Sequence, residues 1–136
     1  MKVQDVLEKK GILIDLKSKD KTALLSQMCR FLCSLYDLKN VDTVTQRIFE
    51  REAQVSTGIG YGVAIPHARL EKIDGVYMIA ARCSDGVAFD AIDDKPVTII
   101  FMMLSPTNTS TDLTGLLSSL SKVMSYEHIR EQLLSA

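Results

Sequence analysis

Apolar residues recur at helical spacing in the N-terminal part of the chain and predict an amphipathic helix there. Its i, i+3, i+4, i+7 stripe consists of Leu24, Leu25, Met28, Phe31, Leu32 and Leu35. A polar side chain just before such a stripe can accept hydrogen bonds from the unpaired amides of the first turn, so Ser18 or Asp20 is the expected N-cap. Asn40 breaks the pattern.

A second helix is predicted to follow, with Asp42 as its cap. Its inward-facing residues are Val44, Ile48 and Phe49, and it should end near Glu52 or Ala53. Arg51 would then lie in its last turn.

Shorter apolar runs predict strands over residues 11–16, 62–65, 76–83 and 97–104. The run 97–104 is rich in β-branched and bulky residues, as is typical of a central strand buried on both faces. Residues 84–86 and 93–96 are expected to form turns.

Helical periodicity returns from Asp112 onward. The stripe is Leu113, Leu116, Leu117, Leu120, Val123 and Met124. Ser125 is the expected cap of a final helix that runs through Leu134. The order of one strand, two helices, several strands and further helices predicts an α/β domain around a mixed sheet.

Composition is that of a globular domain: 136 residues, 46% hydrophobic, 24% charged. A net charge of −1 gives no electrostatic footprint for nucleic acid. The longest apolar run, 97–104, is too short to cross a membrane, and residues 1–5 lack the core of a signal peptide. A cytoplasmic protein without membrane insertion is expected.

Two clusters raise the question of a metal. Cys29 and Cys33 share a helical face and with a histidine can in principle bind zinc, but both fall in an apolar stripe where cysteine acts as a small hydrophobe. The acidic group is Asp85, Asp90, Asp93 and Asp94. Ile92 and Lys95 occupy positions where a calcium loop needs a ligand and a glycine. No metal and no cofactor are expected.

The segment from Thr57 to Arg69 carries the candidate chemistry. Three alternate glycines precede Pro66, which stiffens the backbone before His67. A neutral imidazole is a good nucleophile near pH 7, so the pattern indicates a histidine that receives and passes on a phosphoryl group. His128, the other histidine, lies in the terminal helix and reads as a surface residue.

Several neighbours could stabilise phosphoryl oxygens. They are the side chains of Arg51, Ser56, Thr57 and Arg69, and the backbone amides around Gly58. Arg51 has a second interpretation, because a cation at a helix C-terminus also complements the helix dipole.

The stretch from Arg51 to His67 resembles the active-site signature of enzyme IIA of the fructose–mannitol class. These are phosphocarrier domains of the bacterial phosphoenolpyruvate-dependent phosphotransferase system. The sequence of residues 56–60, and that of residues 89–93 followed by Pro96 and Val97, resembles sequences of the nitrogen-regulatory branch. The resemblance extends from about Val6 to about Met124.

This resemblance implies a three-layer α/β/α sandwich of the mannitol enzyme IIA type, with residues 1–136 as a single type-2 domain. It implies that His67 accepts a phosphoryl group from a histidine phosphocarrier protein, with Arg51 in contact with that group. Arg69 matches a position that is usually basic. The group would then pass to an enzyme IIB domain or serve as a regulatory signal.

The chain departs from the family pattern in two places. Many relatives carry a second histidine beside the first, and here that place falls to Asp112 or Leu113. Asp112 could orient the ring of His67 or merely cap the following helix. The chain also stops at Ala136, short of an extra C-terminal helix.

Three functions therefore remain open. The first is a phosphoryl carrier, with regulation favoured over sugar uptake because no downstream domain is fused. The second is a binding module that no longer transfers phosphate and docks on a kinase, transporter or regulator. The third is a fructose- or mannitol-specific enzyme IIA component. A hydrolase that uses His67 with Ser56 or Thr57 is disfavoured, because no orienting acid or elbow motif is evident.

Overall fold

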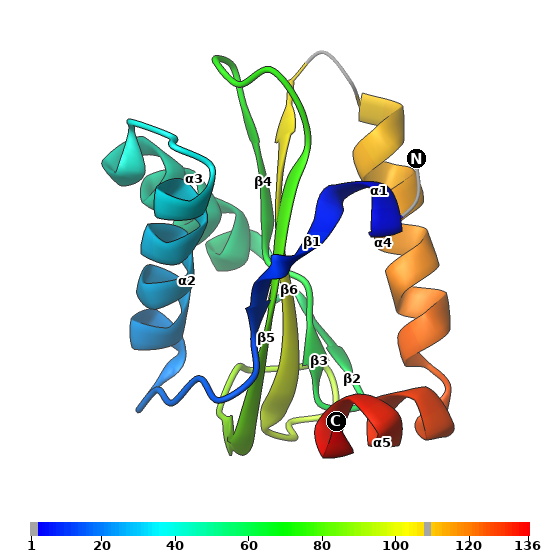
Figure 1. Cartoon of the computed structure of the whole chain (residues 1–136). Coiled ribbons are helices and arrows are strands. Elements are labelled where there is room, and N and C mark those ends of the chain that lie inside the picture. The colour runs from blue at the N-terminus through cyan, green and yellow to red at the C-terminus, as the bar shows by residue number, and fades with distance from the viewer. Residues whose placement is uncertain (1–2, 108–109) are drawn as a thin grey trace.

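The computed structural model describes residues 3–107 and 110–136, and for residues 110–112 it describes the backbone alone. The helices are α1 (Val3–Val6), α2 (Lys21–Leu35), α3 (Val41–Gln54), α4 (Ser110–Met124) and α5 (Glu127–Ser135). The strands are β1 (Leu7–Leu13), β2 (Gly58–Gly60), β3 (Val63–Ala64), β4 (His67–Leu70), β5 (Tyr77–Val87) and β6 (Val97–Pro106). Helices α2 and α3 cover one face of the sheet and α4 covers the other (Figure 1). The predicted three-layer α/β/α fold is confirmed.

Strand β6 is the centre of the mixed sheet. It pairs antiparallel with β5 on one side and parallel with both β3 and β4 on the other. Strand β1 lies parallel to β5 at one edge, and β2 lies antiparallel to β3 at the other. The prediction of a central strand at residues 97–104 is confirmed.

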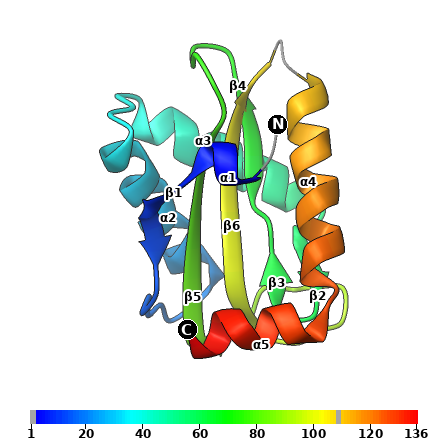
Figure 2. The ribbon, with the colours of Figure 1, turned by 45° about the vertical axis from the view of Figure 1, so that its right-hand side comes forward.

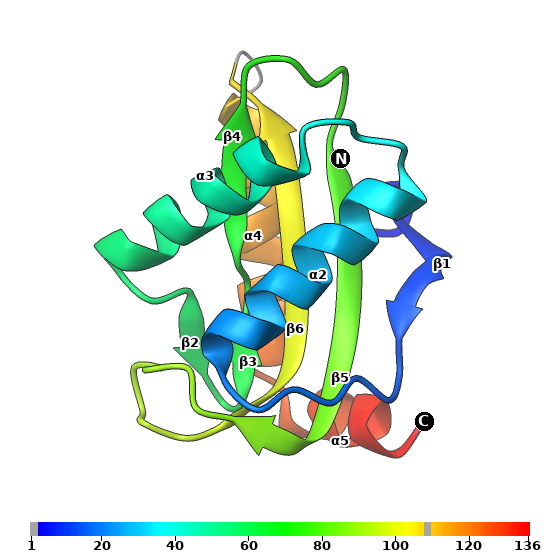
Figure 3. The ribbon, with the colours of Figure 1, turned by 90° about the vertical axis from the view of Figure 1, so that its left-hand side faces the viewer.

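The sheet separates two hydrophobic cores. On β6, Ile100, Met102 and Leu104 pack with α2 and α3, which cross in front of the sheet in Figure 3. The intervening Ile99, Phe101 and Met103 pack toward α4, seen beside the sheet in Figure 2. Because successive side chains of a strand point to opposite faces, burial on both faces explains the unbroken apolar run.

Strands β3 and β4 are two pieces of one interrupted strand beside β6. Val63 is opposite Ile99, and His67 is opposite Met103. Between the pieces, the Ile65 amide donates to Thr57 O at 3.0 Å. Pro66 has no amide to donate, and its carbonyl accepts from the Met103 amide at 2.9 Å. His67 is therefore the first residue of a strand.

The helix boundaries confirm some predicted caps and correct others. Asp20 is the N-cap of α2, and its Oδ1 accepts from the Ala23 amide at 2.8 Å. Helix α3 begins earlier than predicted, so its N-cap is Asn40 and Asp42 lies in the first turn. The cap predicted at Ser125 was also wrong, because its hydroxyl donates back to Lys122 O at 2.6 Å and Tyr126 is the N-cap of α5.

The sheet contains features that the apolar runs did not predict. Residues 84–86 lie inside β5, where a register shift against β6 accommodates them and Gly86 adopts φ +78°, so the predicted turn was wrong. The turn near residue 93 is present, since the Asp94 amide donates to Ala91 O at 2.9 Å. Strand β1 begins and ends earlier than predicted, and the short elements α1, β2 and β4 were missed. Within residues 3–107 and 110–136, no helix has the length and apolar character needed to span a bilayer.

Candidate functional site

The candidate site lies on β4, where the last turn of α3 and the first part of α4 approach the sheet. Alternation along β4 places Ala68 and Leu70 in the core under α2 and α3. His67 and Arg69 therefore point to the other face. A pocket of about 250 Å³ opens there. It is lined by Arg47, Glu50, Arg51, Gln54, His67, Ala68, Arg69 and Leu113.

The ring of His67 is fixed through one nitrogen. Nδ1 lies 2.8 Å from Ile65 O. Because a carbonyl only accepts hydrogen bonds, this contact assigns the proton of the neutral ring to Nδ1 and leaves the lone pair on Nε2. The backbone stem therefore selects the tautomer.

The surroundings of His67 also favour its neutral form. Burial lowers the pKa of the imidazole, and the cations Arg51 and Arg69 lower it further. The hydrogen bond to Ile65 and the carboxylate of Glu52 act in the opposite direction, but the net effect is a pKa below the usual value. An unprotonated nucleophile is consequently available at pH 7.

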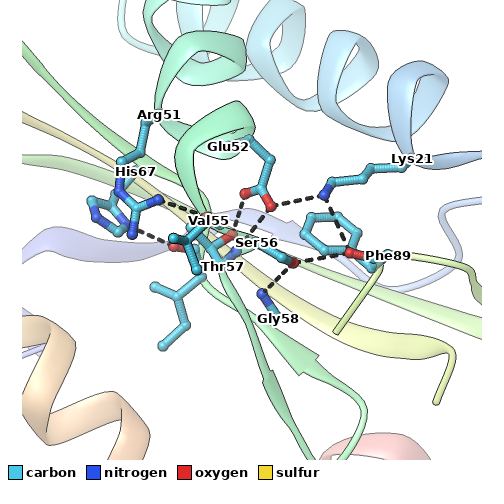
Figure 4. A network of polar contacts seen from close by, with 10 residues as sticks. Lys21, Arg51, Glu52, Val55, Ser56, Thr57, Gly58, His67 and Phe89 are labelled. Atoms are coloured by element: carbon cyan, nitrogen blue, oxygen red, sulfur yellow. Dashed lines mark hydrogen bonds and ion pairs between the residues drawn. The ribbon is translucent and has the colours of Figure 1, made fainter. Parts of the chain in front are cut away.

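Arg51 lies beside His67, and its guanidinium is next to the imidazole in Figure 4. It lies in the last turn of α3, and its Nη1 donates to Val55 O at 2.8 Å. This contact satisfies a carbonyl just beyond the helix end while the guanidinium lines the pocket. The two interpretations of Arg51, helix capping and anion binding, are therefore compatible. Arg69 lines the same pocket from β4.

Ser56, Thr57 and Gly58 have other partners and are absent from the pocket lining. The Ser56 hydroxyl donates to Phe89 O at 2.9 Å and accepts from the Gly58 amide at 3.1 Å. The Thr57 amide donates to Glu52 Oε2 at 2.8 Å, and its hydroxyl donates to the other carboxylate oxygen. A Cβ at Gly58 would lie 2.7 Å from that of Ala91, so this glycine permits close packing. Their direct role at phosphate stays a prediction.

Sequence reasoning missed Glu52. Its side chain is 4% exposed and forms an ion pair with Lys21 at 2.8 Å. One signal was available, because Glu52 continues the buried stripe Val44 and Ile48 at i+4 spacing. A carboxylate on the apolar face of a helix requires buried partners.

The place of the family's second histidine is only partly visible. The side chain of Asp112 lies outside the described residues, so its predicted role is open. Leu113 is 2% exposed and lines the pocket that contains His67. An apolar side chain of α4 therefore lines the same pocket as the candidate histidine.

The remaining candidates lie away from the pocket. Cys29 and Cys33 are buried, and burial raises the pKa of the Cys29 thiol to about 11, which disfavours the thiolate that a metal needs. His128 is exposed on α5, as predicted. Within the described residues, no group of three or more histidine, cysteine, aspartate or glutamate side chains is arranged to hold a metal ion.

Comparison with known proteins places this geometry in a family. Residues 5–136 match the family described as phosphoenolpyruvate-dependent sugar phosphotransferase system, EIIA 2. The chain belongs to this family. The predicted resemblance is confirmed.

Relatives come from both the sugar and the nitrogen branches. A fructose-specific EIIA component of Haloferax volcanii is 39% identical over 70% of this chain and 62% of its own length. A fructose-specific EIIABC component of Bacillus subtilis is 33% identical over 100% of this chain. The chain spans only 21% of that protein, and thus less than two thirds of either relative.

The structure of nitrogen regulatory protein IIA-Ntr from Neisseria meningitidis superimposes with a TM-score of 0.93 at 33% identity. The matched region covers 98% of this chain and 91% of the Neisseria chain. Mannitol enzyme IIA from Escherichia coli, at 17% identity and a TM-score of 0.73, shares the fold.

Proposed function

We propose that the chain is a phosphoryl carrier in which Nε2 of His67 accepts the group from a histidine phosphocarrier protein. The observation that carries this proposal is the 2.8 Å contact between Nδ1 of His67 and Ile65 O. That contact leaves Nε2 as the nucleophilic nitrogen, in a ring whose lowered pKa keeps it neutral.

The transfer exchanges one N–P bond for another. The lone pair of Nε2 attacks phosphorus as the bond to the donor's histidine breaks, and the electron pair of that bond returns to the donor ring. The ring of His67 becomes formally cationic and keeps its Nδ1 proton. Ile65 O, which already accepts a hydrogen bond from the Nδ1–H group, stabilises the new charge.

The phosphoryl oxygens carry the charge of the loose transition state. Arg51 and Arg69 line the pocket with His67 and are the cations that would balance it. A sheltered charged hydrogen bond contributes roughly 1.5–3 kcal/mol. Positioning and charge balance, rather than acid–base chemistry, are thus the work of this site.

A regulatory role, with the group passing to an enzyme IIB domain or a regulatory target, is the form of the proposal that the nitrogen-branch relatives favour. The supporting likeness is that to the Neisseria protein, over nearly all of both chains. The fructose-specific relatives keep a sugar-specific enzyme IIA component as the alternative. A solved complex joins enzyme IIA of the mannitol system to phosphorylated enzyme IIB in Escherichia coli, at 17% identity to this chain.

A second candidate function follows from Leu113. Because this residue presents an apolar side chain to the pocket, the site has no imidazole from this position to support a phosphorylated ring. A protein of this kind that transfers poorly would act by docking on its target.

Intact-mass measurement distinguishes these functions. The protein is incubated with phosphoenolpyruvate, enzyme I and a histidine phosphocarrier protein. We expect wild type and His128→Ala to gain one phosphoryl group, and His67→Ala to gain none. Phosphate retained by His67→Ala would contradict the assignment of the acceptor. A wild-type protein that stays unmodified would favour the docking module.

A further inference from the structure

Glu52 is a carboxylate held inside the protein behind the candidate site. Both of its oxygens accept hydrogen bonds from Thr57, and Lys21 Nζ lies 2.8 Å from Oε2 (Figure 4). Burial of an unpaired carboxylate is costly, so this degree of pairing is what allows the charge to remain in the core. None of these contacts involves the pocket directly.

The hydrogen bonds continue from Glu52 to His67 through the backbone. Glu52 holds the amide of Thr57, and Thr57 O accepts from the Ile65 amide at 3.0 Å. The carbonyl of Ile65 then accepts from Nδ1 of His67 at 2.8 Å. Each residue in this series is bound on one side by the preceding residue and on the other by the next.

Ile65 is the residue whose orientation decides the chemistry. Its amide is bound by Thr57, and the following Pro66 has a restricted φ and a carbonyl bonded to Met103. The direction of the Ile65 carbonyl is therefore fixed by constraints on both sides of the residue. Loss of the hydrogen bond between the Ile65 amide and Thr57 O removes one of these two constraints.

Lys21 also contacts a third segment, the loop after β5 that contains Phe89. Its Nζ also donates to Phe89 O at 3.2 Å and lies 4.4 Å from the centroid of the Phe89 ring. Ser56 donates to the same carbonyl. The start of α2, the end of α3 and the loop after β5 thus meet at the residues that precede the glycine segment.

From this series we infer that Glu52 is a positioning residue, which acts through Thr57 and Ile65 to hold His67 in the tautomer that keeps the Nε2 lone pair available. The consequence for phosphoryl transfer rests on the proposed function. The tautomer itself does not, because it can be measured on the unphosphorylated protein.

A merely structural Glu52 would predict something different. In that case the ion pair with Lys21 anchors two helix ends, and its loss changes stability without changing the ring of His67. A matched pair of double variants separates the roles. Lys21→Met/Glu52→Gln removes the charges but keeps an amide that can accept from the Thr57 amide and donate to its hydroxyl. Lys21→Met/Glu52→Met also removes those hydrogen bonds, and apolar replacement of a buried ion pair is often tolerated by the fold.

The readouts are the ¹⁵N shifts of the His67 ring, at a pH where it is neutral, and the rate of phosphoryl acceptance. We expect wild type and Lys21→Met/Glu52→Gln to keep the proton on Nδ1. In Lys21→Met/Glu52→Met we expect a mixture of tautomers and a kcat lower by about tenfold or more, with little change in KM for the phosphocarrier. Leu32→Ala, a core change on α2, controls for lost stability and should keep the tautomer.

Identical tautomers and kcat in the two double variants would overturn the inference. A change in the tautomer of Leu32→Ala equal to that of the Met variant would do so as well, because it would trace the effect to stability alone. If wild type accepts no phosphate on His67, the proposed function fails, while the ring shifts still decide the role of Glu52.

Discussion

Arg51, in the last turn of helix α3, and Arg82, on the interior strand β5, have different surroundings. Arg82 on β5 donates to Ile14 O at 3.0 Å, Leu133 O at 2.9 Å and Ala136 O at 2.7 Å. In the described part of the chain, Arg51 donates to one carbonyl, Val55 O, and otherwise borders the pocket of His67.

The difference shows how one side-chain type serves two purposes. The guanidinium has five N–H donors in a fixed planar arrangement. At Arg82 several carbonyls occupy those donors and fasten the C-terminal end of the chain to the sheet. At Arg51 one carbonyl of the described residues takes a donor, and the guanidinium otherwise faces the pocket of His67, whose lowered pKa keeps its ring neutral. Under the proposed function, the number of backbone partners distinguishes an arginine that holds the fold together from one that binds the phosphoryl group.

The largest expected contrast is in transfer rate. Arg51→Lys keeps the charge but loses the planar pair of donors, so we expect phosphoryl acceptance by His67 to slow about 10- to 100-fold. Arg82→Lys should transfer at the wild-type rate. Single-turnover transfer from the phosphorylated phosphocarrier, followed by intact mass, measures both. Equal rates for Arg51→Lys and wild type would favour a role for Arg51 in capping alone.

In stability we expect the opposite order, with the larger loss in Arg82→Lys. Arg82→Lys cannot reach all of the carbonyls to which Arg82 donates, so we expect its free energy of unfolding in urea to fall by about 1–3 kcal/mol. Arg51→Lys retains a donor near Val55 O and should lose less than about 1 kcal/mol. A larger loss for Arg51→Lys than for Arg82→Lys would remove the distinction between the two arginines.

Sequence patterns predicted the parts of the fold that depend on local periodicity. The stripe on α2 and its Asp20 cap are local, and the continuous apolar run of β6 reports burial on both faces. Strand β4 was not predicted, because it spans only His67–Leu70 and its partner strand, β6, is distant in sequence. Residues 84–86 look like a turn because the bulge that absorbs them in β5 depends on pairing with β6.

The candidate site likewise contains residues that local sequence predicted and partners that only tertiary contacts bring together. The motif predicted His67 and Arg51 as site residues, because the residue types and their order are visible in the chain, and the structure places both at one pocket. The partners of Ser56 and Thr57 were not visible, since Phe89 and Glu52 become their acceptors only when the loop after β5 meets the end of α3. Glu52 itself looks like any acidic residue of a surface helix until its position on the buried stripe is noticed.

A smaller gain is expected from the apolar wall of the pocket. Leu113→His would place a second imidazole beside His67, and we expect phosphoryl transfer to rise several-fold because a donor then faces the transferred group. Leu120→His, on the same face of α4 but absent from the pocket lining, is the control and should only destabilise the core. A transfer rate that falls in both variants would show that Leu113 is needed for packing alone.

The smallest expected effect is on the titration of His67, where the two arginines can again be compared. Arg51 lowers the pKa of the His67 imidazole, since a nearby cation disfavours imidazolium, while burial is the larger cause. In Arg51→Gln the pKa should therefore rise toward the usual value without reaching it, because the ring stays buried. The neutral ring becomes protonated as pH falls through this pKa. As the pH is lowered, Arg51→Gln should therefore stop accepting the phosphoryl group at a higher pH than wild type.

The control is Arg82→Gln, which leaves the charge beside His67 intact and should titrate as wild type. Ring-proton NMR from pH 4 to 8 measures all three proteins, and an unchanged His67 titration in Arg51→Gln would mean that the guanidinium does not act on the ring as the geometry indicates.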